Sequence, residues 1–537
     1  MKTTTTGGRG SRLGPLWGLA APGFGLLLLP GRRPDGALGR TRPERGKWPA
    51  PWVFSGAQLE VLGNDVLAED GAFTDYTNTD GEWNTVKSNG NDIDLTVWTS
   101  GMVAGMFWLQ YEATGDEMWK TMGERFNTNL EGVELLDDND LGFQVLNSFG
   151  QGYRLSDSES QKEDYKERVL AAADSLYDFK WAGDIPAFWS WSEPSSRPEW
   201  LRAVNVDMIM NMEIMLWASV NGGNESYAED VVGHADTTWK DIVRDDNSTF
   251  HVADYDLDTG DLVEQGTYQG WVDNSTWTRG HTWAIYGYAM IHRYLGEPRF
   301  LERSLSLFSY WEDNIPADLV PPTDFDAPVD AELNGKDSSA SAIVASALFE
   351  LFIITEDPTY LVKAQEYLAA VLSPDYYLPE ATDGWQSILR RASARWGDPE
   401  VGAVFGDYFL LEAMNRYQHL APSILLWQEQ GLKVSVPPAR TPRPDGAPQK
   451  GPFPWPRPTG GGRGLQEATG GKFCALTVVD GKIAFVDPDC VPTPPDFESL
   501  ESNTPSPAAV GASSTSSTVP SVRHSDSDIA VHSCLWR

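Results

Sequence analysis

The sequence has little cysteine and little positive charge for its length. Its 537 residues include only three cysteines, all of them after residue 470. The preceding chain therefore has no disulfide, no cysteine-ligated metal and no cysteine nucleophile. The 41 Lys and Arg residues face 77 Asp and Glu residues, which gives a formal net charge of -36. Because nucleic-acid binding depends on basic side chains that neutralise phosphates, we predict no nucleic-acid partner.

Motifs for several common chemistries are missing between residues 51 and 420. The histidines include no His-x-x-x-His pair, which is a frequent arrangement of two zinc ligands on a helix. Glycine-rich nucleotide-binding patterns and the Gly-x-Ser-x-Gly elbow of hydrolases are also absent. We therefore predict no metal and no cofactor. A hydrophobic content of 41% with 11% aromatic residues is nevertheless typical of a folded chain.

Residues 1–50 form a leader of distinct composition. They contain nine basic and two acidic residues, and an apolar run that includes Leu26–Leu29 resembles the core of a signal peptide. A working signal peptide predicts secretion, whereas a disordered leader or a gene-model artefact is compatible with a cytoplasmic protein. Glycine and proline interrupt the run, which is barely long enough to span a bilayer, so we predict no membrane partner.

Residues 421–537 form a tail rich in Pro, Gly and Ser, as is typical of linkers. Within it, two β-prone runs flank the turn pair Asp480-Gly481 and predict a short hairpin inside 474–490. Cys474 and Cys490 stand at the two ends of this segment. The leader and the tail thus enclose one acidic body, residues 51–420, which we expect to be the functional domain.

Apolar residues in the body recur at helical spacing. Leu361, Ala364, Leu368 and Val371 form one such stripe, and few segments alternate with the period of a strand. Four turns of similar composition connect the predicted helices, at 114–116, 221–224, 295–297 and 355–357. Repeated helical hairpins stack to bury their apolar faces, and about six fit the body. We predict an all-α domain, with an open solenoid and a closed (α/α)6 barrel both compatible with the pattern.

Two aspartates lie among apolar residues. Asp140 is followed by Leu-Gly-Phe, and Asp207 has apolar neighbours on both sides. Since acidic residues are usually exposed, an acid in such a run indicates a helix cap or a functional group shielded from water. Asn205 offers an alternative cap near Asp207, whereas both interpretations stay open for Asp140.

The segment 248–287 concentrates side chains that suit a sugar acid. It contains His251, Gln269, Arg279 and Trp283, of which Arg279 and Trp283 are four residues apart and share a helix face. Aromatic faces pack on sugar rings, and polar groups fix hydroxyls and carboxylates. Each residue alone is compatible with a structural role, so the prediction depends on their concentration.

These segments together resemble the unsaturated glucuronyl hydrolases, glycoside hydrolase family 88. The blocks that carry the resemblance follow the family's order across residues 60–420 and include Trp98-Thr-Ser-Gly, Asn139-Asp140-Leu-Gly-Phe143, Val206-Asp207-Met-Ile-Met-Asn211, Gln269-Gly270, Trp277-Thr-Arg-Gly280 and Asp337-Ser-Ser-Ala-Ser-Ala342. The resemblance implies an (α/α)6 barrel. It also implies a cofactor-free hydrolase that releases 4,5-unsaturated uronic acid from the non-reducing end of lyase-generated oligosaccharides.

The resemblance also assigns roles to residues. Asp207 would protonate C4 of the double bond and help water add at C5, with Asp140 as the second essential carboxylate. Two neighbouring carboxyls in a partly dry site cannot both ionise easily, so one is expected to keep a proton for donation. The residues that would bind the sugar are Trp98, His251, Thr267, Gln269, Arg279 and Trp283.

His281 and Asn139 depart from the family's pattern, which usually has Gln and His at these positions, and we expect both changes to affect substrate preference. Two alternatives remain. One is another α/α-toroid enzyme, such as an unsaturated rhamnogalacturonyl hydrolase or a sugar epimerase. The other is an inactive glycan-binding toroid, although both site aspartates are present. The oligomeric state is left open.

Overall fold

The computed structural model describes residues 50–66, 73–86, 95, 97–192, 194, 196–328, 333–377, 384–430, 476–479 and 482–485. The chain divides into two compact units, of which one comprises Met1–Leu26 with Thr469–Arg537 and the other Leu27–Ala468. In the first unit, β8 (Leu476–Val479) pairs antiparallel with β9 (Lys482–Phe485), within the segment where a short hairpin was predicted. Its turn, the three cysteines and residues 1–49 lie outside the described residues.

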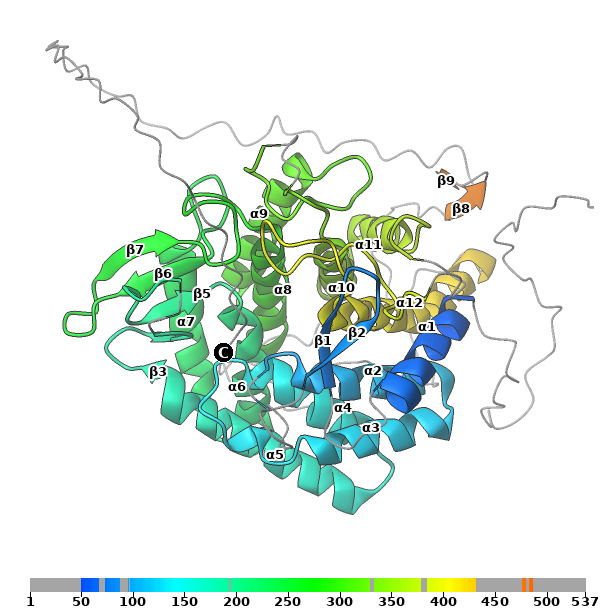
Figure 1. The fold of residues 1–537 in the computed structure, drawn as a ribbon, viewed down its shortest axis with the longest axis horizontal. Helices are drawn as coiled ribbons and strands as arrows, with labels where there is room; N and C mark the ends of the chain where they lie inside the picture. The colour runs from blue at the N-terminus through cyan, green and yellow to red at the C-terminus, as the bar shows by residue number, and fades with distance from the viewer. Residues whose placement is uncertain are drawn as a thin grey trace, which may run out of the picture. The chain divides into compact units, whose positions relative to one another are not determined.

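Helices dominate the second unit (Figure 1). Its α-helices are α1 (Ala50–Val61), α2 (Ser100–Thr114), α3 (Glu117–Asn129), α4 (Gln151–Leu155), α5 (Glu159–Lys180), α6 (Met208–Asn221), α7 (Tyr227–Asp241), α8 (Thr278–Leu295), α9 (Pro298–Asn314), α10 (Ser338–Thr355), α11 (Pro358–Val371) and α12 (Val404–Gln430). Two π-helices, η1 (Leu62–Val66) and η3 (Gly142–Gly150), and the 3-10 helix η2 (Val133–Leu135) complete the helical part. The predicted helix-rich body is confirmed, and the boundary set at 420 falls within α12.

The helix ends follow the local chemistry of the turns. α2, α6, α8 and α10 end at the first residue of the four predicted turns. Gly115 and Gly296 stop α2 and α8 with φ angles of 64° and 72°, a left-handed conformation that side chains disfavour. Asp116 and Asp357 then cap α3 and α11, because each side chain accepts a backbone N–H from the first turn.

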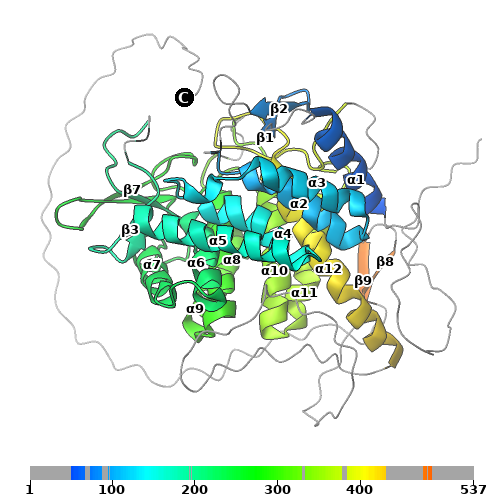
Figure 2. The same ribbon diagram turned by 90° about the horizontal axis from the view of Figure 1, so that it is seen from below.

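Six helical segments contact one another in succession. α2 packs against η3, η3 against α6, α6 against α8, α8 against α10, and α10 against α12, which packs in turn against α2. α3, α5, α7, α9 and α11 each pack mainly against one member of this series, as α7 does on α6 (Figure 2). α10 is buried from Ser338 to Phe352, whereas α9 buries only five residues. The first series is therefore an inner layer, and the second an outer layer with one face in water.

α10 has the length and hydropathy of a membrane span, but 83% of that window is buried inside the structure. An apolar helix enclosed in this way is typical of a protein core. Its hydrophobic character is therefore explained by its place in the inner layer.

Short strands accompany the helices and were not predicted. β1 (Phe73–Thr77) pairs with β2 (Trp83–Val86), and β3 (Trp181–Ala182) pairs with β4 (Ala187–Phe188). A three-stranded antiparallel sheet has the order β5 (Ala203–Asn205), β6 (Val252–Tyr255) and β7 (Leu262–Gly266). This sheet matters for the site, because β5 leads directly to Asp207 and β6 begins directly after His251.

Candidate active site

Asp207 stands at the N-terminus of α6 but does not cap it. The backbone N–H of Met208 donates instead to Asn205 Oδ1 at 3.1 Å, as the sequence suggested. Asp207 Oδ2 accepts a hydrogen bond from Asn205 Nδ2 at 3.2 Å. Its Oδ1 is buried and has no hydrogen-bond partner among the described residues. Such an atom is costly unless a proton or a bound group satisfies it, which favours the functional interpretation of Asp207.

His251 lies against Asp207 in a fixed tautomer. Its Nδ1 accepts the backbone N–H groups of Tyr268 at 3.1 Å and Gln269 at 3.2 Å. A nitrogen that accepts carries no proton, so the neutral ring holds its proton on Nε2. Nε2 is 3.4 Å from Asp207 Oδ2. Nε2 is buried and makes no hydrogen bond to the described residues, so His251 lies beside the carboxylate without bonding to it in this structure. Protonation of Nδ1 would disrupt both backbone contacts.

Thr267 and Gln269 belong to the same cluster as His251. The Thr267 hydroxyl lies 3.4 Å from His251 Nδ1 and accepts the backbone N–H of Gly270 at 2.7 Å. The Gln269 side chain donates to the carbonyl of Ala394 at 3.1 Å. These bonds join the end of β7 to the segment around residue 394.

Asp140 lies in the loop before η3 and is tied to α6. Its Oδ1 accepts a 2.9 Å hydrogen bond from Asn211 Nδ2. Burial raises the pKa of Asp140 well above its usual value; the Asp138 and Asp207 charges act in the same direction, and the Asn211 bond opposes them. The sequence led us to expect that one carboxyl of the pair keeps a proton. The surroundings of Asp140 favour its protonated form in the free protein.

Arg279 is enclosed by its own hydrogen bonds. It is 1% exposed, and Nη1 lies 2.9 Å from Asp337 Oδ2 in a buried ion pair. The guanidinium also donates to the carbonyls of Ser393 and Ala394. Arg279 thus holds the same segment that Gln269 contacts, and its direct contact with substrate stays a prediction.

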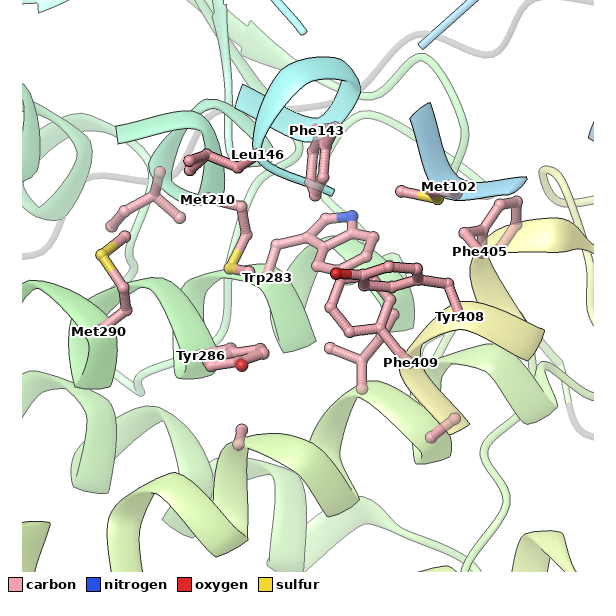
Figure 3. Close-up of a cluster of buried hydrophobic side chains, with 14 of the residues drawn as sticks. Met102, Phe143, Leu146, Met210, Trp283, Tyr286, Met290, Phe405, Tyr408 and Phe409 are labelled. Atoms are coloured by element: carbon pink, nitrogen blue, oxygen red, sulfur yellow. The ribbon is translucent and has the colours of Figure 1, made fainter. Parts of the chain in front are cut away.

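Trp98 and Trp283 both pack against the ring of Phe143. The ring centroid of Phe143 lies 5.4 Å from Trp98 and 5.3 Å from Trp283. Trp98 is partly buried, whereas Trp283 is 1% exposed and packs against Phe409 within the aromatic cluster of Figure 3. Trp283 is therefore a core residue behind Phe143 in this structure, and Trp98 retains an accessible surface.

Comparisons with known proteins identify the family of the chain. No family model matches the chain. It is 36% identical to the unsaturated glucuronyl hydrolase of Formosa agariphila over 329 residues, which cover 60% of this chain and 80% of the relative. It is 33% identical to the unsaturated glucuronyl hydrolase of a Bacillus species over 350 residues, which cover 63% and 90% of the two chains. The chain belongs to the unsaturated glucuronyl hydrolase family.

A solved unsaturated glucuronyl hydrolase described as specific for heparin has a similar fold. It superposes with a TM-score of 0.63 at 26% identity and covers 70% of this chain and 98% of the other. The predicted family and enzyme class are thus confirmed, and the chain is a glycosidase. Among the described residues of this hydrolase, no group of three or more His, Cys, Asp or Glu side chains is arranged to hold a metal.

The two departures from the family's pattern have different surroundings in the hydrolase. His281 is fully buried, its Nε2 lies 2.9 Å from the carbonyl of Leu307 in α9, and burial lowers its pKa to about 4. Core packing therefore accounts for His281, and its expected effect on substrate preference has no support in these contacts. Asn139 is 6% exposed and directly precedes Asp140, so its expected effect stays a prediction.

The prediction of site residues did not assign roles to Asn211, Asp337 and Asp138. Asn211 lies four residues after Asp207, a spacing that places both on one helix face and could have revealed it. Asp138 lies two residues before Asp140 and accepts its backbone N–H at 2.8 Å. Asp337 pairs with Arg279 across 58 residues of sequence, and no local signal indicates this contact.

Proposed function

We propose that this hydrolase removes a 4,5-unsaturated uronic acid from the non-reducing end of oligosaccharides produced by polysaccharide lyases. The names of its relatives support this substrate class. The observation that carries the proposal is the unpaired Oδ1 of Asp207, beside His251 and linked through Asn211 to Asp140. A carboxyl with one fixed oxygen and one unsatisfied oxygen is suited to transfer a proton.

The reaction begins with protonation of the double bond. Asp207 Oδ1 gives its proton to C4, and C5 takes the hydroxyl of a water whose proton returns to Asp207. The product is a hemiketal at C5. Its bond from C5 to the ring oxygen breaks to leave a ketone, and the hemiacetal formed at C1 then expels the remaining sugar. Each glycosidic bond broken consumes one water, and the balance requires no redox cofactor.

The partners of Asp207 Oδ2 explain why the proton would be transferred at Oδ1. Asn205 Nδ2 donates to Oδ2 at 3.2 Å, and His251 Nε2 lies 3.4 Å from the same oxygen. A proton on Oδ2 would compete with the Asn205 donor, so the protonated carboxyl carries it on Oδ1. The same arrangement favours Oδ1 as the oxygen that receives a proton from water.

Binding of the sugar is assigned to Trp98, Thr267 and Gln269. His251, Arg279 and Trp283 belong to the predicted set as well, but each is 1% exposed. We assign these three a supporting role in the free protein. Direct contact with the sugar would require the segment at 393–394 to move away from Arg279, or Phe143 from Trp283.

The domain around this site is proposed to be a closed (α/α)6 barrel. The succession of inner contacts that ends with α12 on α2 supports closure, as does the similarity to solved hydrolases of the family. Secretion through residues 1–50 remains a proposal, as do the absence of nucleic-acid and membrane partners and of a cofactor.

The test uses the conjugated double bond, whose near-ultraviolet absorbance disappears on hydration. We expect the wild-type chain to consume an unsaturated chondroitin or heparin disaccharide and Asp207→Asn to abolish the reaction while staying folded. Asp258→Asn, at an exposed position, is the matched control and should react normally. Substantial turnover by folded Asp207→Asn would reject the proton-transfer assignment, and absorbance loss without release of a free sugar would reject hydrolysis.

A further inference from the structure

We propose that Asn211 is a positioning residue for the active site: it orients the Asp140 carboxyl and favours its ionised form. This inference rests on the proposed function. Asn211 is fully buried and lies in α6, one helical turn after Asp207. It therefore connects the helix that carries one aspartate to the loop that carries the other.

The amide of Asn211 has a single orientation. Its Oδ1 accepts the backbone N–H of Phe143 at 2.9 Å, and a backbone N–H can only donate. Nδ2 must then face Asp140, and it donates to Asp140 Oδ1 at 2.9 Å. The two ends of the amide thus make separate contacts, because Oδ1 accepts a backbone N–H of η3 and Nδ2 donates to the Asp140 carboxylate.

The packing around Asn211 prevents the amide from turning away. A Cβ atom built on Gly142 would lie 2.6 Å from both Cα and Oδ1 of Asn211. Only glycine allows η3 to approach α6 this closely. The two helices therefore hold the amide between them, and its geometry does not depend on the conformation of an exposed side chain.

The charges around Asp140 give the amide an electrostatic role. Asp138 in the same loop and Asp207 at the start of α6 both disfavour a second negative charge there. Lys180 acts on Asp138 and is paired with Asp137, while His251 faces Asp207. The donor from Asn211 favours ionised Asp140, because it stabilises the charge of the accepting oxygen. Loss of this donor would favour the protonated form of Asp140 further and would leave its carboxyl without this orienting contact.

The isosteric change Asn211→Asp separates the two tasks of the amide. The carboxyl still accepts the N–H of Phe143, but when ionised it presents an oxygen instead of a donor to Asp140. We expect kcat at about pH 7 to fall at least tenfold, the equivalent of about 1.4 kcal/mol. When the new carboxyl is protonated it donates again, so kcat should recover toward the wild-type value near pH 5, with KM changed less than about threefold.

Two further variants make the result decisive. Asn211→Leu has no titratable group and loses both bonds, so its kcat should be low at both pH values without acid recovery. Asn415→Asp places the same change at another fully buried amide, which donates to the carbonyl of Leu109 at 3.0 Å. That control should lose stability without a shift of its pH profile. Thermal unfolding at each pH establishes that every variant is folded where it is assayed.

Three outcomes would overturn the inference. One is a wild-type pH profile for folded N211D, another is acid recovery of Asn211→Leu, and the third is a matching shift in Asn415→Asp. If N211D unfolds near neutral pH, the test depends on Asn211→Leu. A normal kcat of that variant would by itself reject the positioning role of Asn211. Activity of Asp207→Asn would instead reject the proposed function itself, so the two failures are distinguishable.

Discussion

Replacing Arg279 with methionine should destabilise the hydrolase strongly. The change leaves the Asp337 carboxylate, which is fully buried, without its ion-pair partner, while Ser339 still donates to it. Breaking a buried ion pair by removal of one partner costs about 3–5 kcal/mol. Unsatisfied carbonyls at 393 and 394 add about 1–3 kcal/mol each if water does not reach them. Since the free energy of unfolding of a domain is roughly 5–15 kcal/mol, the variant should be marginally stable.

The assay is urea unfolding of a double-mutant cycle. Asp337→Asn alone should also destabilise the hydrolase, because it leaves the buried guanidinium with two carbonyls but without its ion-pair partner. The double variant R279M/D337N removes both charges. We expect its loss of unfolding free energy to be smaller, by about 3 kcal/mol, than the sum of the losses of the two single variants. Activity is measured separately, because the predicted sugar contact of Arg279 affects turnover but not unfolding.

A surface pair supplies the control. Lys162 and Glu159 lie 3.3 Å apart, with side chains 27% and 90% exposed. Lys162→Met should change the unfolding free energy by less than about 1 kcal/mol. If Arg279→Met costs no more than this control, or if the double variant shows no coupling, the buried pair does not stabilise the segment at 393–394 and the reasoning fails.

Two further predictions concern the aromatic residues and the response to acid. Trp283→Ala should lower the unfolding free energy by about 3–5 kcal/mol, as expected for a buried aromatic residue. Trp98→Ala should mainly raise KM. If the two variants change stability and KM equally, this division of roles is wrong. Burial lowers the pKa of His234 from 6.5 to about 3. The unfolded chain therefore binds a proton at higher pH than the folded chain, and stability is lost as pH falls from 6.5 toward 3. His234→Gln should flatten this dependence in urea-unfolding curves, and an unchanged slope would refute the assignment.

Local sequence signals explain why the helices were predictable. Turns such as 114–116 and 355–357 combine a residue that ends one helix, an acidic residue that caps the next and an aromatic residue after it. These signals lie within a few residues of one another, so these turns were located correctly. Strands β3 to β5 were missed because they have only two or three residues, too few for alternation. Their pairing partners are set by tertiary contacts, as in the match of Asn205 with Val252.

The site was predictable as a set of residues but not as a set of contacts. His251, Thr267 and Gln269 were placed together because they are close in sequence, and the structure joins them around Nδ1 of His251. Arg279 and Trp283 have the residue types of a sugar site, yet burial depends on packing against distant segments such as 393–394 and Phe409. No pattern in the sequence predicts the π-helical form of η3, the helix that contacts Asn211.

The contact between α12 and α2 has a consequence for how the chain folds. Asn415 donates to the carbonyl of Leu109, and Gln418 donates to that of Ala113, across more than 300 residues of sequence. During synthesis, α2 is made long before the helix that covers it, so its apolar face stays exposed until most of the domain has been synthesised. Contacts this distant slow folding and expose the half-made chain to aggregation. A chain that ends before α12 should therefore be a substrate for chaperones rather than a smaller enzyme.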